Sequence, residues 1–137
     1  MSQENVEAFK RAIDAFNRRD VEALLDELDP EVEWHPGIAA ALLGGEATVY
    51  RGHDGIREWL RDVSDAFAEL RVELSEIVDR DDRIVAIGRF RARGRKSGAD
   101  TESPAAYLVE VTATKARVVR IYLDPAEALA AASLREG

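Results

Sequence analysis

Three stretches in the first half of the chain carry apolar residues at the spacing of an amphipathic helix. In residues 2–19 the apolar positions recur every three or four residues, at Val6, Phe9, Ile13 and Phe16. Asp20 has the side chain of a helix N-cap and precedes a short apolar stretch ending at Leu28. A third stripe starts near His53 or Asp54 and contains Ile56, Trp59, Leu60, Val63 and Phe67. The pattern therefore predicts three helices.

The second half alternates apolar and polar residues with the period of a β-strand. Four strands are predicted, over residues 70–78, 84–93, 102–112 and 117–123, and two short strands precede them at 31–35 and 48–51. Asp29-Pro30 is expected to end the second helix. The apolar positions change parity near Ser75-Glu76, which predicts a β-bulge. Asp124-Pro-Ala-Glu127 has the form of a capping box and predicts a C-terminal helix.

This order of elements predicts the fold class. Helices followed by a run of antiparallel strands are typical of an α+β domain. A long, bulged sheet must curl, and three N-terminal helices would then cover its concave face. We therefore expect residues 1–137 to form one domain, shaped like a cone, with a central pocket between helices and sheet.

Composition and charge narrow the class of protein. The 137 residues are 46% hydrophobic and 34% charged, contain no cysteine and carry a net charge of −8. This apolar share argues against disorder, and the absence of cysteine excludes disulfide frameworks and zinc fingers. An acidic chain is unsuited to nucleic acid or to an anionic membrane. No window reaches the ~18 uncharged apolar residues of a membrane helix, and no secretory leader is present, so we expect a cytoplasmic protein.

Several local strings resemble the nuclear transport factor 2-like superfamily, and specifically its branch of SnoaL-like polyketide cyclases and ketosteroid isomerase-like proteins. They are residues 15–20 (AFNRRD), 28–36 (LDPEVEWHP), 50–56 (YRGHDGI) and 121–124 (IYLD). The resemblance covers nearly the whole chain. It implies a cystatin-like cone with a central pocket and a homodimer built on the outer face of the sheet. The superfamily contains isomerases, cyclases, hydrolases and pocket proteins without assigned chemistry, so the fold alone does not select an activity.

The resemblance also suggests candidate catalytic residues. His35 precedes Pro36 where similar isomerases carry their proton-shuttling aspartate, and imidazole has a pKa suited to acid–base work near neutral pH. Tyr107 stands where similar cyclases carry a histidine and can donate to a developing oxyanion. Ile121 stands where they carry an acid or base and cannot exchange a proton. Phe16 or a neighbour replaces the phenol of the isomerases.

The remaining candidates are apolar or aromatic residues expected to form a ligand-binding wall. They are Phe16, Trp34, Tyr50, Trp59, Phe90, Ile121 and Leu123. Trp34 and His35 are adjacent on one strand, so only one of them is expected to face inward. For Trp59 and Phe90 ordinary core packing is the favoured interpretation. Residues 38–43 are apolar and would form either a lid over the pocket or a plug inside it.

Other features favour structural roles. Arg89, Arg91, Arg93 and Arg95 share one strand face and are interpreted as a solvated outer face, or a dimer rim, paired with acidic residues of adjacent strands. His35 and His53 lack the spacing of a metal site. No phosphate-binding loop or nucleophile motif is present, and no cofactor is expected.

Three functions remain open. The chain could be a cofactor-free isomerase or cyclase that moves a proton on a small apolar ketone or polyketide-like substrate, with His35 as the proton carrier. It could bind a small apolar molecule without chemistry, which the missing acid at Ile121 favours. It could also be a homodimeric structural domain with a filled cavity.

Overall fold

The computed structural model describes residues 2–37, 49–80, 82–112 and 115–136. Residues 38–48, which contain the predicted lid or plug, lie outside the described residues. The elements follow the predicted order of helices, then strands, then a terminal helix. They are α1 (Ser2–Arg18), α2 (Val21–Asp26), β1 (Leu28–His35), β2 (Tyr50–Arg51), α4 (Gly52–Ala66), β3 (Phe67–Asp79), β4 (Arg83–Gly94), β5 (Asp100–Thr112), β6 (Lys115–Tyr122) and α5 (Pro125–Glu136).

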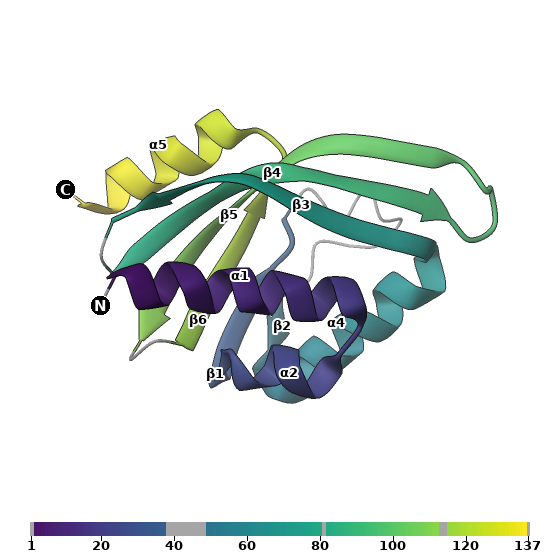
Figure 1. Cartoon of the computed structure of the whole chain (residues 1–137), viewed down its shortest axis with the longest axis horizontal. Helices are drawn as coiled ribbons and strands as arrows, with labels where there is room; N and C mark the ends of the chain where they lie inside the picture. The colour runs from purple at the N-terminus through teal and green to yellow at the C-terminus, as the bar shows by residue number, and fades with distance from the viewer. Residues whose placement is uncertain (1, 38–48, 81, 113–114, 137) are drawn as a thin grey trace.

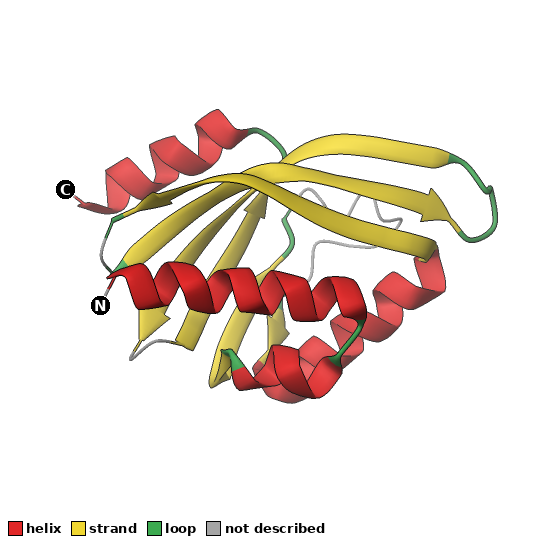
Figure 2. Ribbon diagram, viewed as in Figure 1, coloured by secondary structure: helices red, strands yellow, loops and turns green. Residues whose placement is uncertain are grey.

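The strands form one six-stranded sheet in the order β2-β1-β6-β5-β4-β3. All neighbouring pairs are antiparallel except β1 and β6, which are parallel. The sheet curves around α1, α2 and α4, and α5 lies on its opposite side (Figure 1; Figure 2). We call the side facing α1, α2 and α4 the inner face and the side facing α5 the outer face. The arrangement confirms the predicted α+β class with a curved sheet.

The helices bury the stripes that the sequence pattern predicted. In α1 the buried positions include Phe9, Ile13 and Phe16. The stripe of α4 is buried from Ile56 to Val63, whereas Phe67, which was predicted to end it, begins β3 and is partly buried. The Asp20 side chain caps α2 by accepting a hydrogen bond from the Ala23 N–H at 3.1 Å. Because each stripe faces the concave side of the sheet, the helices and the sheet share one continuous apolar core.

The first strand begins earlier than predicted. Asp29 and Pro30 lie inside β1 and do not end α2, which stops at Asp26. Proline lacks the N–H that a regular ladder requires. Pairing between β1 and β6 is irregular between Leu28 and Glu33, so Pro30 sits where no regular ladder is formed. The predicted boundary at Pro30 was wrong because it ignored this irregular pairing.

A bulge bends the long strands. The register between β3 and β4 shifts between Leu74 and Glu76, as the parity change at Ser75-Glu76 predicted. Gly88 of β4 pairs with Leu74 beside this bulge, and a Cβ atom at Gly88 would overlap the carbonyl oxygen of Glu73. Glycine is therefore required because the two backbones approach too closely for any side chain.

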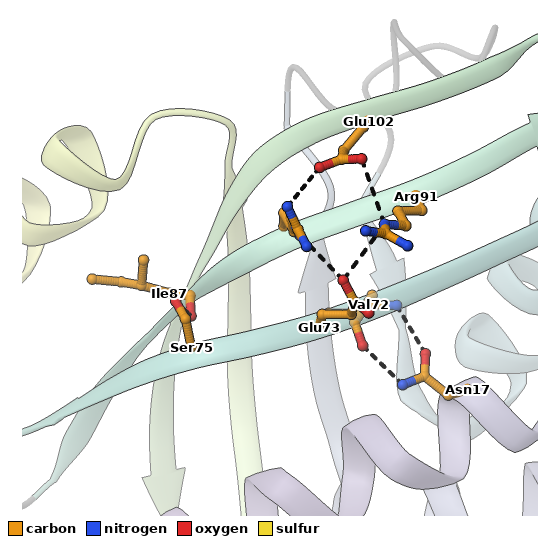
Figure 3. Close-up of polar contacts among 8 residues, drawn as sticks. Asn17, Val72, Glu73, Ser75, Ile87, Arg91 and Glu102 are labelled. Atoms are coloured by element: carbon orange, nitrogen blue, oxygen red, sulfur yellow. Dashed lines mark hydrogen bonds and ion pairs between the residues drawn. The ribbon is translucent and has the colours of Figure 1, made fainter.

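Strand β3 is the edge of the sheet, and α1 covers part of that edge. The Asn17 side-chain amide donates to the Val72 carbonyl and accepts from the Val72 N–H, both at 2.9 Å (Figure 3). These two bonds replace the partners that a further strand would supply. They attach the end of α1 to the sheet at Val72, which pairs with Phe90 of β4.

On the outer face, α5 covers one half of the sheet. Its residues Ala128 and Ala132 pack against Val85, Ala106 and Leu108, and all five are buried. Val85 is therefore covered by the chain's own terminal helix. The uncovered half is the arm, defined as residues 67–74 of β3, 88–94 of β4 and 100–105 of β5. None of the described helices is long and apolar enough to cross a membrane.

Candidate ligand-binding cavity

A small cavity lies between α1, α4 and the inner face of the sheet. Its volume is about 40 Å³. Because a water molecule needs roughly 10–15 Å³ on this measure, the cavity has room for about three waters. The described residues that line it are almost all apolar: Ile13, Phe16, Trp34, Trp59, Leu70, Val72, Phe90, Ala105, Tyr107 and Ile121.

The register of the sheet explains the floor of the cavity. Phe90 pairs with Val72, and Tyr107 pairs with Ile121, so their side chains emerge side by side on the inner face. Trp34 reaches the cavity from β1, where buried Val32 and Trp34 alternate with more exposed neighbours. The alternation along the strands thus directs large side chains toward the same cavity.

Aromatic rings pack against each other around this space. The centroids of the Trp34 and Trp59 rings are 6.2 Å apart, with 41° between the ring planes. Tyr50 extends the group, with its ring centroid 5.4 Å from that of Trp59. Such tilted pairs stabilise beyond the area they bury. They also present flat apolar surfaces suited to a ring-containing ligand.

Three hydrogen-bond donors belong to this apolar wall. The indole N–H groups of Trp34 and Trp59 are buried and have no hydrogen-bond partner among the described residues. Tyr107 lines the same cavity, and burial raises the pKa of its phenol well above its usual value. It therefore stays protonated near neutral pH and is available as a donor.

The structure does not bring His35 to this cavity. Its Nε2 lies 3.1 Å from Glu33 Oε1 on the same side of β1, opposite to Trp34. The bond with His35, with added attraction from Arg51 and Arg117, lowers the pKa of the Glu33 carboxyl. His35 is thus part of a polar cluster on the other face of the strand, because alternation sends Trp34 inward.

The other predicted wall residues divide into two groups. Those that line the cavity are Phe16, Trp34, Trp59, Phe90, Tyr107 and Ile121. Tyr50 stands behind Trp59, and its hydroxyl donates to Asp62 at 2.6 Å, which contributes with burial to a pKa of about 12. Leu123 follows the end of β6 and packs at the periphery of the core.

Sequence reasoning missed several lining residues. Leu70, Val72 and Ala105 belong to strands whose alternation was predicted, and Ile13 belongs to the predicted stripe of the first helix. Their apolar parity was the available signal. It did not separate them from core residues elsewhere on the same faces, because the position of the helices over the sheet is not encoded locally.

No group of three or more histidine, aspartate or glutamate side chains in the described part of the chain could hold a metal ion. Within the same part, the lining holds no carboxylate, imidazole or amine. The lining therefore suits contact with an apolar group and can donate hydrogen bonds to it. A base would have to come from outside the described lining.

Comparison with known proteins identifies the family. Residues 9–121 match the SnoaL-like domain. No curated protein is significantly similar in sequence. The chain resembles the solved structure of TerC co-crystallized with polyporic acid, with 25% identity, a TM-score of 0.79, and coverage of 98% of this chain and 99% of that one.

Two further structures share the fold. A nuclear transport factor 2-like protein of unknown function from Burkholderia pseudomallei K96243 is 24% identical, with a TM-score of 0.80 over 93% of this chain and 95% of that one. A candidate polyketide cyclase from Xanthomonas campestris pv. campestris is 20% identical, with a TM-score of 0.71 over 94% and 96%. Because the family match spans most of the sequence, the chain belongs to the SnoaL-like domain family.

Proposed function

We propose that this protein binds a small apolar molecule that carries an acceptor oxygen, such as a ketone or quinone, in the cavity between α1, α4 and the sheet. One observation carries the proposal: the indole N–H groups of Trp34 and Trp59, two residues of the cavity lining, are buried and have no partner among the described residues. Each buried, unsatisfied donor costs about 1–3 kcal/mol, which a ligand oxygen would recover.

The size of the cavity limits how such a ligand enters. Room for about three waters is less than a six-membered ring requires, so lining side chains must shift when a ring binds. The complex of TerC with polyporic acid supports that compound as a first probe. The aromatic wall around Trp34 and Trp59 is the expected contact surface for such a probe.

The second candidate is a cofactor-free isomerase or cyclase acting on the same kind of molecule. The Tyr107 hydroxyl favours it, because a protonated phenol in an apolar site can stabilise an enolate oxygen. In this version His35 would carry the proton. It would have to exchange its contact with Glu33 for one with the substrate, so His35 is the weaker half of the hypothesis.

Intrinsic fluorescence tests the binding proposal directly. The chain has two tryptophans, Trp34 and Trp59, and both line the cavity, so quenching by added polyporic acid reports occupancy. We expect saturable quenching, weakened about tenfold in Tyr107→Phe by loss of one hydrogen bond. Tyr122→Phe is the matched control, because Tyr122 packs on the outer-face cluster beside α5.

Two results would count against the proposal. Absence of saturable quenching would favour the structural domain with a filled cavity. Equal affinities of the wild type and Tyr107→Phe would remove Tyr107 from the site. Conversion of a bound ketone, measured by its proton exchange with solvent, would support the enzyme instead. Loss of that turnover in His35→Ala would identify His35 as the proton carrier.

The homodimer implied by the family resemblance is a separate proposal. The arm offers the uncovered part of the outer face, where exposed Arg89 and Arg91 alternate with buried positions of β4. Light scattering at micromolar concentration should give twice the chain mass. A monomer mass under those conditions would exclude this assembly.

A further inference from the structure

A second hollow lies beside the cavity, between the α1–α2 connection and α4. This groove has a volume of about 420 Å³ and is open to solvent. Its lining is rich in arginine: Arg19, Val21, Arg57, Leu60, Arg61, Ser64 and Asp65. Three guanidinium groups and one carboxylate thus meet in one groove of a chain whose net charge is −8.

The charges of the groove are incompletely balanced. Arg57 donates to Glu22 at 3.1 Å. Arg61 lies one helical turn further along α4 and has no ion pair with any described residue. Arg57 and Arg61 are like charges at i and i+4, an arrangement that destabilises a helix slightly. Among the described residues, the groove therefore keeps a cation without an ion-pair partner.

Arg19 connects the groove with the cavity. Its guanidinium lies 4.4 Å from the centre of the Phe16 ring and donates to the carbonyls of Phe16 at 2.6 Å and Leu70 at 3.0 Å. Phe16 and Leu70 line the cavity, whereas Arg19 lines the groove. The Arg19 side chain is therefore part of the layer that separates the two spaces.

The position of Arg19 is unusual for its residue type. It ends α1 with φ of +58°, a left-handed conformation normally occupied by glycine at this helix position. Burial lowers the pKa of its guanidinium, and the described partners of that group are carbonyls and a ring, without a carboxylate. A partly desolvated cation held only by neutral acceptors would gain from a carboxylate partner.

We propose that the groove binds the acidic group of the ligand whose apolar body occupies the cavity. This inference rests on the proposed function and specifies its ligand class: an apolar, ring-containing carboxylate. Displacement of Arg19 from Phe16 and Leu70 joins the two spaces, which provides the room that the cavity alone lacks. The carboxylate then pairs with Arg19 and Arg61 at the edge of α4.

A matched pair of probes tests the charge requirement. The naphthoate anion and the neutral naphthamide have nearly the same shape, and both can be followed by quenching of Trp34 and Trp59. We expect naphthoate to bind about tenfold more tightly than naphthamide. In Arg61→Gln this preference should fall toward one, because naphthoate affinity drops while naphthamide affinity does not change.

Two more variants locate the effect. Arg19→Gly suits the positive φ, so its backbone should stay folded; it should also lose the preference for naphthoate and bind naphthamide at least as well as the wild type. Arg18→Gln is the control: Arg18 pairs with Asp14 and Asp20 on the adjoining turn and does not line the groove, so the preference should remain.

The outcomes separate this inference from the proposed function. Equal binding of both probes, sensitive to Tyr107→Phe but not to Arg61→Gln, would overturn the acidic subsite and leave the cavity proposal standing. Failure of both probes and of polyporic acid to quench would overturn both. Naphthoate binding without tryptophan quenching, detected by calorimetry, would place the anion in the groove alone and overturn the link to the cavity.

Discussion

The polar groups on the two faces of β4 differ in whether they have partners. On the outer face of the arm, Arg89 contacts Glu73 at 3.1 Å and Glu102 at 2.7 Å. Arg91 lies 3.6 and 3.5 Å from the same two carboxylates, and Figure 3 shows Arg91 between Glu73 and Glu102. On the inner face, Phe90 joins an apolar cavity where the indole donors of Trp34 and Trp59 remain without partners in the described chain.

This difference separates structural charges from candidate functional groups. The arginine stripe is solvated and paired, as predicted for Arg89, Arg91 and Arg93, so it needs no ligand to explain it. Arg95 departs from the stripe and donates to the carbonyls of Ser64 and Phe67. The inner donors destabilise the free protein, and binding an acceptor would remove that cost.

The largest expected effect comes from Gly88, the glycine beside the bulge that bends β3 and β4. Gly88→Ala would push a methyl group into the Glu73 carbonyl at the bulge, so we expect a loss of about 3 kcal/mol in the free energy of unfolding. Urea titration would measure it. Gly98→Ala, at φ of +68° with open space around it, should cost only about 1 kcal/mol.

If Gly88→Ala were no worse than Gly98→Ala, the close backbone approach would not determine the bend. The bend of the arm would then have to come from the hairpin at its end. The close approach of the backbones at Gly88 would no longer explain how the two faces are arranged.

The next effect concerns the contact that attaches α1 to the edge of the sheet. Asn17→Ala removes two hydrogen bonds to the Val72 backbone and leaves both groups of that strand unpaired, which we expect to cost about 2 kcal/mol. Thermal and urea unfolding would report it. Ser75→Ala, which removes one exposed bond to the Ile87 carbonyl (Figure 3), should change stability by less than about 0.5 kcal/mol.

Equal effects of these two substitutions would contradict the view that α1 is fixed by hydrogen bonds to the edge strand. Hydrogen exchange at the Val72 amide gives an independent measurement, since its protection should be lost selectively in Asn17→Ala.

Substitutions of two tyrosines test most directly the difference between paired and unpaired polar groups. Tyr107→Phe deletes a hydroxyl from the apolar lining of the cavity, and we expect it to raise stability by about 1 kcal/mol while weakening ligand binding. Tyr50→Phe deletes a hydroxyl bonded to Asp62, so stability should fall by about 1 kcal/mol. Opposite signs in unfolding experiments distinguish an unpaired group from a paired one.

A stability loss in Tyr107→Phe matching that of Tyr50→Phe would show that the Tyr107 hydroxyl is satisfied in the free protein. That result would remove Tyr107 from the donors of the proposed ligand site.

The outer ion pairs should contribute least at neutral pH. Replacing Glu73 and Glu102 together by glutamine should cost about 0.5 kcal/mol, because exposed pairs gain little and are screened by salt. Unfolding at low and high ionic strength would test this, and the difference between variant and wild type should shrink in salt. A loss several times larger and independent of salt would give the stripe a structural importance not expected of it.

At alkaline pH the paired tyrosine should produce a stability change that is absent at neutral pH. Burial and the bond to Asp62 raise the pKa of Tyr50 from its usual value of 10 to about 12. Folding thus favours the protonated phenol, and its contribution is complete below pH 10 and is lost as the pH rises through about 12. The wild type should lose stability more steeply than Tyr50→Phe across this interval, and parallel curves would contradict the assignment.

Features carried by short stretches of sequence were predictable. The stripe of Phe9, Ile13 and Phe16 and the parity change at Ser75-Glu76 each follow from local periodicity, and the structure confirms both. The cap at Asp20 is local for the same reason. The choice between Trp34 and His35 was not predictable, because alternation says only that they point to opposite faces.

The sequence by itself determined the elements, their order and the family, because backbone periodicity and turn chemistry depend on neighbouring residues. Only the tertiary structure decided that Trp34 faces the cavity while His35 contacts Glu33, and that Pro30 lies within β1. It also decided that Arg19 lies between cavity and groove. These outcomes depend on how distant strands and helices pack, and packing leaves little trace in any one segment.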